Sequence, residues 1–350
     1  MIDFLYIKIL DSSFVKLDEE ILNRHFRTKS FLMNNRGIIA FLWSIIRLNC
    51  FLIVNLPFSK ALYVRFADHY SFLPALFCKV FHKKLVVVVG GYDAVHIPEY
   101  GYGVYHSKIR GFCARYTFKQ ANLILPNNPT LVENINTFSN DYPRREGVKH
   151  FVPDIKAQIH VVYNGFKTNF WENFHFTNRD KVLTVAFVND KKTFYLKGID
   201  LFFKVAEKMP DIPFEMVGLN FDLVHKMKLN VPINVRLIPQ TSADELKLLY
   251  NHAKVFALFS LTEGMPNVLC EAMLCGCIPV GSNVNAIPEI IGDTGIVVGR
   301  KDISILAEAI SSALKLTKDA EEKARERILN NFTIERREQE LVSVLCPMIK

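Results

Sequence analysis

The sequence predicts an α/β protein of two doubly wound domains that face a cleft between them. Three observations carry this prediction. The 350 residues exceed the usual size of one domain. Short β-branched or aromatic runs alternate with longer apolar-periodic stretches in both halves. A polar, turn-rich segment over 138–153 separates the halves. Because parallel sheets bind ligands at the carboxyl ends of their strands, both domains can present residues to one cleft.

The sequence of the first half predicts four strands with two helices between them, and one further strand at its end. Val86 to Val89 stand before Gly90-Gly91, which indicates a strand buried on both faces that ends in a turn. A further strand over 159–163 stops at the turn dipeptide Asn164-Gly165, where we place the hinge. The expected strands of this half are 4–10, 62–66, 84–89 and 123–126, and the helices are 71–81 and 106–120.

The second half repeats this rhythm more regularly. A helix is expected after Gly198, another over 242–252, and a third from Pro266 or Asn267 to about 274, with a helical turn over 288–291. The expected strands are 182–188, 214–218, 235–238, 255–258, 278–280 and 295–298. We therefore expect domains over 1–163 and 164–330, and a C-terminal helix over 331–350 that packs back on the first domain.

Composition excludes several classes of protein. Half of the residues are hydrophobic and the charged fraction is ordinary, which is typical of a globular chain. Seven scattered cysteines support neither a disulfide framework nor a zinc site.

The N-terminus lacks the basic region of a secretory signal, so we expect a cytoplasmic protein. The apolar run 37–56 approaches the length of a membrane span, but Arg47 and Asn49 in its middle favour a buried helix that leads into a strand.

The net charge of +8 lies entirely in the first half. Residues 1–163 hold 20 Lys and Arg against 12 Asp and Glu, whereas residues 164–350 hold 23 of each. A basic half suits an anionic partner, either the acidic face of a membrane or a phosphate-bearing acceptor. The alternative is an ordinary solvated surface of mixed charge. Nucleic acid is not expected as a partner, because the basic residues follow no recognisable nucleic-acid-binding motif.

Two carboxylates, Glu263 and Glu271, stand at either end of a turn and a helix start. Pro266 suits the beginning of a helix, and Gly264 permits a close approach of the backbone to a ligand. The N–H groups at the helix start can bind a phosphate between the two carboxylates. The alternative is an acidic surface turn followed by a helix.

The run from Glu263 to Glu271 resembles the E-x7-E motif of the family 4 retaining glycosyltransferases, which have the GT-B fold of two Rossmann-like domains. The flanking residues resemble that family as well, and the resemblance extends over most of the chain. The further matches are Glu271-Ala272-Met273, Gly276, Pro279-Val280, Pro288-Glu289-Ile290-Ile291 before Gly295, Lys197-Gly198, Val217-Gly218, Asn164-Gly165 and Gly90-Gly91-Tyr92-Asp93.

The resemblance implies a role for each matching residue. Glu271 would accept hydrogen bonds from ribose hydroxyls, and Glu263 would face the donor sugar. Lys197 and the amides near 265–267 would stabilise the leaving diphosphate, so no metal is expected. The implied catalytic residues are Glu263, Lys197 and, on the acceptor side, Asp93. The implied donor-binding residues are Glu271, Gly264, Met265, Pro266, Asn267, Val268, Lys192 and Pro239.

The sequence departs from the family pattern at two places. Lys192 stands where many relatives have an arginine, and a lysine lacks the bidentate fork of arginine. The glycine-rich loop after the first strand of many relatives is replaced by Asp11-Ser12-Ser13-Phe14. Pro239 would hold the base through backbone atoms, which leaves uracil and guanine equally compatible.

We therefore expect a cytoplasmic enzyme, at the inner face of the cell membrane, that transfers a sugar with retention. The donor would be a UDP-sugar or a GDP-sugar, with no cofactor, and the acceptor a surface glycan or its lipid-linked precursor. A sugar-nucleotide epimerase, a phosphorylase and a non-catalytic nucleotide-sugar-binding protein remain alternatives. A nicotinamide-dependent dehydrogenase is disfavoured because no G-x-G-x-x-G follows the first strand.

Overall fold

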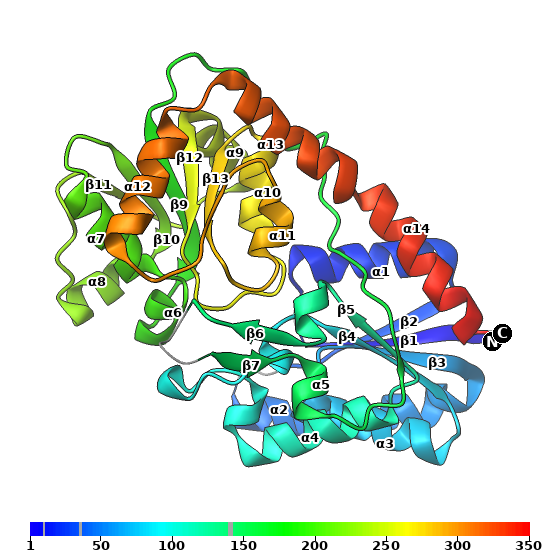
Figure 1. Cartoon of the computed structure of the whole chain (residues 1–350). Helices are drawn as coiled ribbons and strands as arrows, with labels where there is room; N and C mark the ends of the chain where they lie inside the picture. The colour runs from blue at the N-terminus through cyan, green and yellow to red at the C-terminus, as the bar shows by residue number, and fades with distance from the viewer. Residues whose placement is uncertain (10, 35–36, 139–142) are drawn as a thin grey trace. The chain divides into compact units, whose positions relative to one another are not determined.

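The chain folds into two compact units. The computed structural model describes all residues except 10, 35, 36 and 139–142 (Figure 1). The first unit comprises Met1–Asn134, Arg145–Gly165 and Ile334–Lys350, and the second comprises Ile135–Arg144 and Phe166–Thr333. Two short strands, β6 (Asn134–Asn136) and β7 (Arg144–Glu146), pair where the chain passes from one unit to the other.

A six-stranded parallel sheet forms the centre of the first unit. Its order is β2-β1-β3-β4-β5-β8, so the direction of winding reverses between β1 and β3. The strands are β1 (Ile2–Lys8), β2 (Thr28–Leu32), β3 (Ser59–Arg65), β4 (Lys84–Val89), β5 (Leu123–Pro126) and β8 (Gln158–Ile159). The strands expected at 84–89 and 123–126 are confirmed, and that expected at 62–66 begins earlier. The strand expected over 159–163 is wrong in extent, since β8 has two residues. Residue 10 of the strand expected over 4–10 lies outside the described residues.

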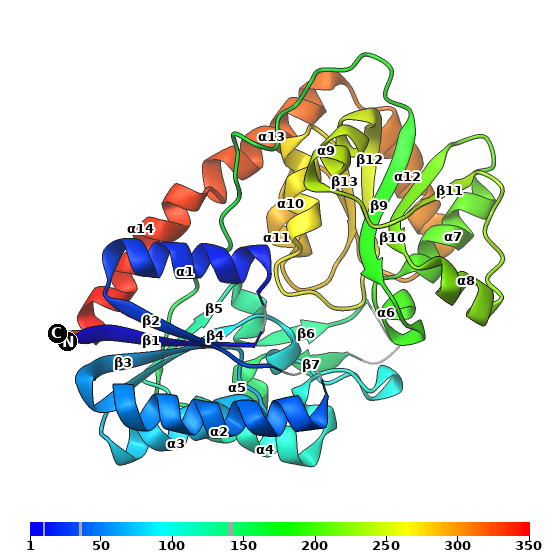
Figure 2. The same cartoon turned by 180° about the vertical axis from the view of Figure 1, so that it is seen from behind.

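Helices cover both faces of this sheet (Figure 2). One face packs against α2 (Ile38–Asn55), α3 (Phe72–Val80) and α4 (Lys108–Gln120), and the other against α1 (Ser13–His25) and α14 (Ile334–Leu345). Successive side chains of a strand point to opposite faces. Leu85 and Val87 accordingly join the first core, and Val86 and Val88 the second. The expected burial of β4 on both faces is confirmed.

A buried charge cluster fixes the C-terminal helix to the first unit. Arg337 of α14 donates to Asp18 of α1 over 2.6 and 2.9 Å, and to the carbonyl oxygens of Val162 and Tyr163. Asp18 also accepts from Tyr63 at 3.1 Å and pairs with the fully buried Arg65. Burial alone would raise the pKa of Asp18, but the guanidinium groups of Arg337 and Arg65 hold it below its ordinary value.

The second unit is also built on a six-stranded parallel sheet. Its order is β11-β10-β9-β12-β13-β14, so the winding reverses between β9 and β12. The strands are β9 (Lys181–Val188), β10 (Phe214–Leu219), β11 (Val235–Ile238), β12 (Ala253–Leu258), β13 (Ile278–Ser282) and β14 (Ile296–Val298). All six strands expected in this half are confirmed within two residues at each end.

The helices of the second unit alternate with these strands. They are α6 (Lys191–Leu196), α7 (Ile199–Lys208), α8 (Phe221–Met227), α9 (Ala243–His252), α10 (Asn267–Leu274), α11 (Ile287–Ile291), α12 (Ile303–Leu314) and α13 (Lys318–Asn331). The helix start expected at Pro266 or Asn267 is confirmed, with Pro266 at the N-cap. Helix α6 was not expected, because its polar sequence has no clear apolar period.

Candidate functional site

A lysine at the C-terminal end of α6, which follows β9, meets a glutamate in the loop that follows β12. The Nζ of Lys197 lies 2.7 Å from Oε1 of Glu263. The Lys197 side chain keeps 33% of its surface exposed and that of Glu263 keeps 9%. Ligands of doubly wound sheets bind where the winding order reverses, at the carboxyl ends of the strands. The pair therefore occupies the position at which this sheet topology places a ligand.

Backbone contacts hold these two segments against each other. The N–H of Leu261 donates to the carbonyl oxygen of Leu196 at 2.8 Å. Gly198 has a φ of +65°, and a Cβ at this position would lie 2.1 Å from the carbonyl oxygen of Phe259. Only glycine accommodates both the left-handed backbone and the close approach. The position of Lys197 beside Glu263 is thus set by the chain on either side of it.

Asn285 positions the backbone of Glu263. Its Oδ1 accepts the N–H of Glu263 at 2.9 Å, and Asn285 itself has a φ of +45°. Asparagine tolerates this conformation better than most residues. Asn285 was not predicted from the sequence. Its location in a polar loop after β13 was the only available signal, and such loops are common.

The segment between Glu263 and α10 forms a helix start at the same edge. Met265 and Pro266 are buried, whereas Gly264, Asn267 and Val268 are partly exposed. Pro266 occupies the N-cap position and makes no side-chain cap hydrogen bond. The N-terminal end of a helix also carries a partial positive charge. This segment is therefore suited to an anionic group.

Glu271 lies one turn inside α10. Its Oε2 is 3.5 Å from the hydroxyl of the fully buried Tyr250 of α9. Burial raises the pKa of Glu271 to about 7. The residue as a whole retains partial exposure, and a ligand hydroxyl that contacted the carboxylate would replace the lost hydration. Tyr250 is a further residue that the sequence analysis missed, because a tyrosine on an amphipathic helix carries no distinctive signal.

Lys192 follows β9 and Pro239 follows β11, so both lie at the carboxyl ends of strands of this sheet. Lys192 is exposed in the first turn of α6, and Pro239 is exposed directly after β11. Asp190 caps α6 by accepting the N–H of Thr193 at 2.8 Å. Burial raises the pKa of Asp190. The hydrogen bonds that Thr193 donates and the nearby Lys192 lower that pKa by more, so it lies below its ordinary value. The donor-binding roles of Lys192 and Pro239 stay predictions.

Asp93, in the first unit, is enclosed by its own loop. One carboxylate oxygen accepts the N–H of Ala67 at 3.0 Å, and the other accepts those of Gly90 and Gly91 at 3.1 and 3.2 Å. The residue is fully buried, and burial raises its pKa to about 6 despite these hydrogen bonds. These contacts give Asp93 a role in shaping the loop after β4. Its catalytic role stays a prediction.

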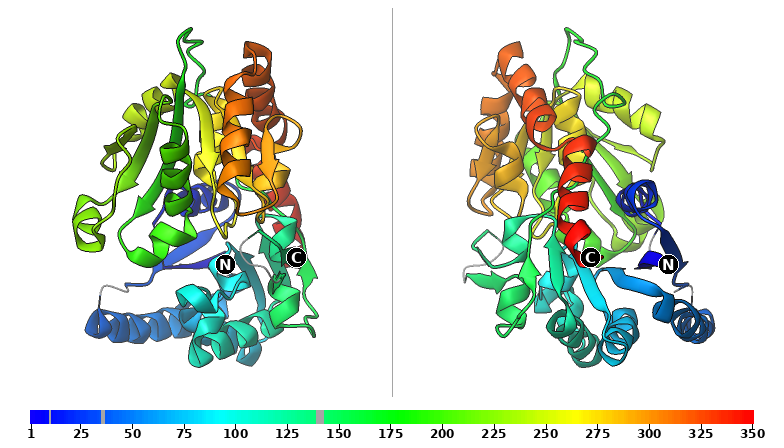
Figure 3. Two further views of the ribbon diagram at one scale, coloured as in Figure 1. Left: turned by 60° about the vertical axis from the view of Figure 1, so that its left-hand side comes forward. Right: turned by 90° about the vertical axis from the view of Figure 1, so that its right-hand side faces the viewer.

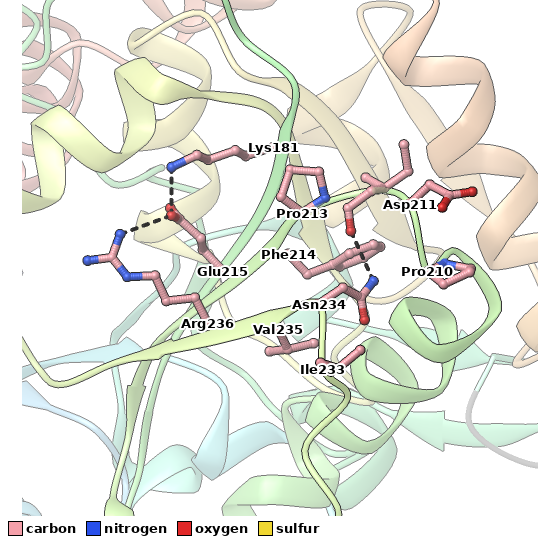
Figure 4. Close-up of a pocket in the computed structure, with 11 residues that line it drawn as sticks. Lys181, Pro210, Asp211, Pro213, Phe214, Glu215, Ile233, Asn234, Val235 and Arg236 are labelled. Carbon is pink, nitrogen blue, oxygen red and sulfur yellow. Dashed lines mark hydrogen bonds and ion pairs between the residues drawn. The ribbon is translucent and has the colours of Figure 1, made fainter.

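A pocket of about 440 Å³ lies at the opposite edge of the second sheet (Figure 4). It is lined by residues at the amino ends of β9, β10 and β11, among them Lys181, Glu215 and Arg236. Glu215 accepts from Lys181 at 2.8 Å and from Arg236 at 3.5 Å. Because doubly wound sheets bind their ligands at the carboxyl ends of the strands, this pocket is not the candidate site.

The candidate site combines a cation, a helix start and two carboxylates. A lysine and backbone amides together bind and neutralise phosphate groups. Carboxylates accept hydrogen bonds from hydroxyl groups. The arrangement suits a ligand that carries both phosphates and hydroxyls.

Comparison with protein families supports this reading of the second unit. Residues 167–331 match the family described as Glycosyl transferases group 1. O-antigen chain mannosyltransferase B of Escherichia coli is 33% identical over 81 residues, which cover 23% of this chain and 21% of that protein. N-acetyl-alpha-D-glucosaminyl L-malate synthase of Bacillus anthracis is 32% identical over 127 residues, covering 34% of this chain and 32% of that protein. The chain thus spans less than a third of the length of these curated relatives in each match.

Solved structures share the fold over the whole chain. HepE of Anabaena, determined with UDP and glucose, has a TM-score of 0.70 at 14% identity and covers 99% of this chain and 100% of its own. Sucrose-phosphate synthase of Thermosynechococcus elongatus has a TM-score of 0.74 at 11% identity, with 99% of both chains covered. The predicted fold class, two Rossmann-like domains of the GT-B type, is confirmed. Residues 167–331 in addition resemble the group 1 glycosyltransferases in sequence.

Proposed function

We propose that this protein is a glycosyltransferase that transfers a sugar from a nucleotide-sugar donor to a glycan or lipid-linked saccharide. The observation that carries the proposal is the Lys197–Glu263 pair at the winding reversal of the second sheet. The match of residues 167–331 to the group 1 glycosyltransferases supports it. UDP in the HepE structure supports a nucleotide donor.

Each residue of the candidate site has a role in the proposed reaction. Lys197 and the start of α10 bind the diphosphate and stabilise the negative charge that develops as it leaves. Glu263, adjacent to Lys197, faces the sugar that is transferred. Glu271 accepts hydrogen bonds from the ribose hydroxyls, which supply the polar partner that its buried carboxylate needs. Pro239 holds the base, and Lys192 adds a second cation.

The proposed transfer proceeds with retention at the anomeric carbon and without a metal. The bond between the anomeric carbon and the diphosphate oxygen breaks through an oxocarbenium-like transition state. The acceptor hydroxyl attacks from the face that the leaving group vacates, and its proton passes to the departing diphosphate. The positive charge that a metal supplies in other transferases comes here from Lys197 and the helix start. Both features are proposals that rest on the resemblance to retaining family 4 enzymes.

The names of the relatives support a proposal for the acceptor and for the cellular location of the reaction. O-antigen chain mannosyltransferase B and serotype-specific mannosyltransferase WbdA of Escherichia coli are named for transfer of mannose. A role in surface polysaccharide synthesis on the cytoplasmic side of a membrane is consistent with these names. The donor base stays open between uracil and guanine.

The proposal is tested by incubating the full chain with a panel of UDP-sugars and GDP-sugars and saccharide acceptors. We expect release of one nucleoside diphosphate and a product whose anomeric configuration, read by NMR, matches that of the donor. Glu263→Gln should lower the rate roughly a hundredfold or more. The exposed carboxylate Glu308 of α12 provides the control variant Glu308→Gln, which should keep the rate.

Other outcomes of the same panel would overturn parts of the proposal. Interconversion of one nucleotide sugar into its epimer would show an epimerase. Tight binding without turnover of any donor would show a non-catalytic binding protein. Inversion at the anomeric carbon would refute retention while leaving glycosyl transfer intact.

A further inference from the structure

Helix α2 presents a stripe of exposed apolar side chains. They recur at three- and four-residue spacings, which places them along one side of a helix. The stripe consists of Ile39, Leu42, Trp43, Ile46, Ile53 and Val54, with exposed fractions between 53% and 85%. Phe58, in the short 3₁₀ turn Leu56–Phe58 that follows, adds a side chain that is 67% exposed. Soluble proteins rarely expose so many large apolar residues on one element.

The opposite side of α2 is fixed in the first unit. Leu48, Leu52 and Leu56 are fully buried in the core beneath the sheet. Asn55 accepts from Lys29 at 2.8 Å, and the hydroxyl of Ser44 accepts the N–H of Asn34 at 2.9 Å. The segment Ile39–Phe58 is long and apolar enough to cross a membrane, with 28% of its most apolar part buried. Because one side is packed on the core from Phe41 to Leu56, α2 is suited to lie in a membrane surface and not to cross it. The expected helix that leads into a strand is confirmed, but its burial is one-sided.

Helix α3 lies next to α2, and α4 lies next to α3, on the same face of the sheet (Figure 3). Val80 and Phe81 at the end of α3, and Ile109 and Phe112 of α4, are exposed. The sequences of α2, α3 and α4 contain no Asp or Glu within their described bounds. Their exposed basic residues are Arg47, Lys79, Lys108, Arg115 and Lys119. We call the exposed apolar and basic residues of α2, α3 and α4 the α2 surface.

The nearby acidic residues offset only part of this charge. Lys119 pairs with the exposed Asp154 at 2.8 Å, whereas Arg47, Lys79, Lys108 and Arg115 have no ion pair among the described residues. Asp68 is buried, and Arg110 of α4 and His69 hold its pKa down at about 2 against the effect of burial, which raises it. Asp93 is enclosed by backbone N–H groups. The α2 surface is therefore apolar and positively charged at once, which is the combination that binds anionic lipid headgroups and the acyl chains beneath them.

We propose that the α2 surface docks the protein on an anionic phospholipid bilayer, with α2 parallel to the membrane plane. The stripe enters the boundary between headgroups and acyl chains, and Trp43 lies at that boundary, where tryptophan is favoured. The exposed Lys and Arg side chains contact lipid phosphates. The docking is independent of the donor site, since all of its residues lie in the first unit.

Tryptophan fluorescence reports this docking directly. The chain has two tryptophans, of which Trp43 is 61% exposed and Trp171 is 7% exposed. Vesicles of equal parts phosphatidylglycerol and phosphatidylcholine should bind the full chain in a flotation assay and shift the emission to shorter wavelength. Trp43→Phe should keep the binding and lose the shift. Phosphatidylcholine vesicles should bind much less, and salt should weaken binding because the Debye length falls from about 10 Å at 0.1 M to about 3 Å at 1 M.

Polar substitutions on the stripe test its role. Leu42→Ser combined with Ile46→Ser should reduce the bound fraction on phosphatidylglycerol vesicles roughly tenfold or more. The fully exposed Ile233 of the second unit gives the matched control, Ile233→Ser, which should bind as the unmodified chain does. Unchanged melting temperature and unchanged nucleotide binding would show that the double variant is folded.

Three results would overturn the proposal. The first is that vesicles of neither composition float the protein. The second is that the stripe variant binds as well as the control. The third is that light scattering shows a dimer that the stripe variant abolishes while no vesicle binds, which would assign the surface to a second copy of the chain.

Discussion

The two sheets have related topologies but use the charges near their winding reversals differently. In the first unit, Arg65 ends β3 beside the reversal and is fully buried against Asp18. In the second unit, Lys197 and Glu263 follow the two strands at the reversal and keep part of their surface exposed. One pair of charges holds the fold together, and the other is accessible to a ligand. The position in the sheet alone therefore does not identify a binding site.

The pKa values of two buried carboxylates, Asp18 in the first unit and Glu271 in the second, are shifted in opposite directions. The pKa of Asp18 lies below its ordinary value because the fold supplies two guanidinium groups against the cost of burial. The pKa of Glu271 is raised to about 7 because burial removes water and Tyr250 is its weak partner. A buried carboxylate that the fold satisfies is structural, whereas one with a raised pKa at an accessible edge gains from a ligand.

The largest effect is expected for the buried cluster of the first unit. Asp18→Ala would leave Arg65 and Arg337 buried without their carboxylate, and we expect a loss of about 3–5 kcal/mol in the free energy of unfolding. Urea unfolding measures this loss. Glu20→Ala, at an exposed position of the same helix, is the control and should change stability by less than about 0.5 kcal/mol. Equal effects of the two substitutions would refute a structural role for Asp18.

An effect of opposite sign is expected at Glu271. Its folded pKa of about 7 exceeds the ordinary glutamate value of 4.5 that applies to the unfolded chain. The folded state therefore binds more protons between these values, and stability falls as pH rises through that window. Glu271→Gln removes the ionisation. At about pH 8 it should raise the free energy of unfolding by about 1–3 kcal/mol, with little change near pH 4.

The same substitution should weaken nucleotide binding, because Gln offers one acceptor oxygen where the carboxylate offers two. Hydrogen exchange of the second unit, together with nucleotide titration, separates the two effects. If Glu271→Gln lowered stability at about pH 8, the raised pKa would be contradicted. If binding were unchanged, the ribose role would fail.

A smaller effect is expected at Asp93. Asp93→Asn replaces one acceptor oxygen by an NH₂ group that faces backbone N–H donors, which should cost about 1–2 kcal/mol of stability. If Asp93 only shapes its loop, kcat per folded molecule should stay within a few-fold of the unmodified enzyme. If the predicted catalytic role is right, kcat per folded molecule should fall by much more than a few-fold, with the same loss of stability. Parallel measurement of kcat and melting temperature decides between these roles.

The fold was predictable where local pattern and tertiary environment agree. The strand at Val86–Val89 and the helix start at Asn267 are confirmed. A run of β-branched residues favours a buried strand, and a proline such as Pro266 favours the beginning of a helix, whatever the rest of the chain does. β2 was missed because its sequence, Thr28 to Leu32, is polar and becomes a strand only by pairing with β1. α2 was expected to be buried because its apolar sequence does not show which side the core covers.

The candidate site was predictable only in part. The resemblance named Lys197 and Glu263, and the structure places them 2.7 Å apart. It did not name Asn285 or Tyr250, which act through contacts between distant segments. Residues that position others through tertiary contacts leave little trace in a single sequence. On the acceptor side, the departure at Asp11–Phe14 leaves no family pattern to follow.

The central claim is that the second unit binds a nucleoside diphosphate through Lys197. Calorimetric titration of the full chain with UDP and GDP tests it most directly. We expect one of them to bind, and Lys197→Ala to weaken that binding roughly tenfold or more, while Lys226→Ala, at an exposed position of α8, leaves it unchanged. Absence of binding by both nucleotides, or equal binding to the Lys197→Ala and Lys226→Ala variants, would contradict the account.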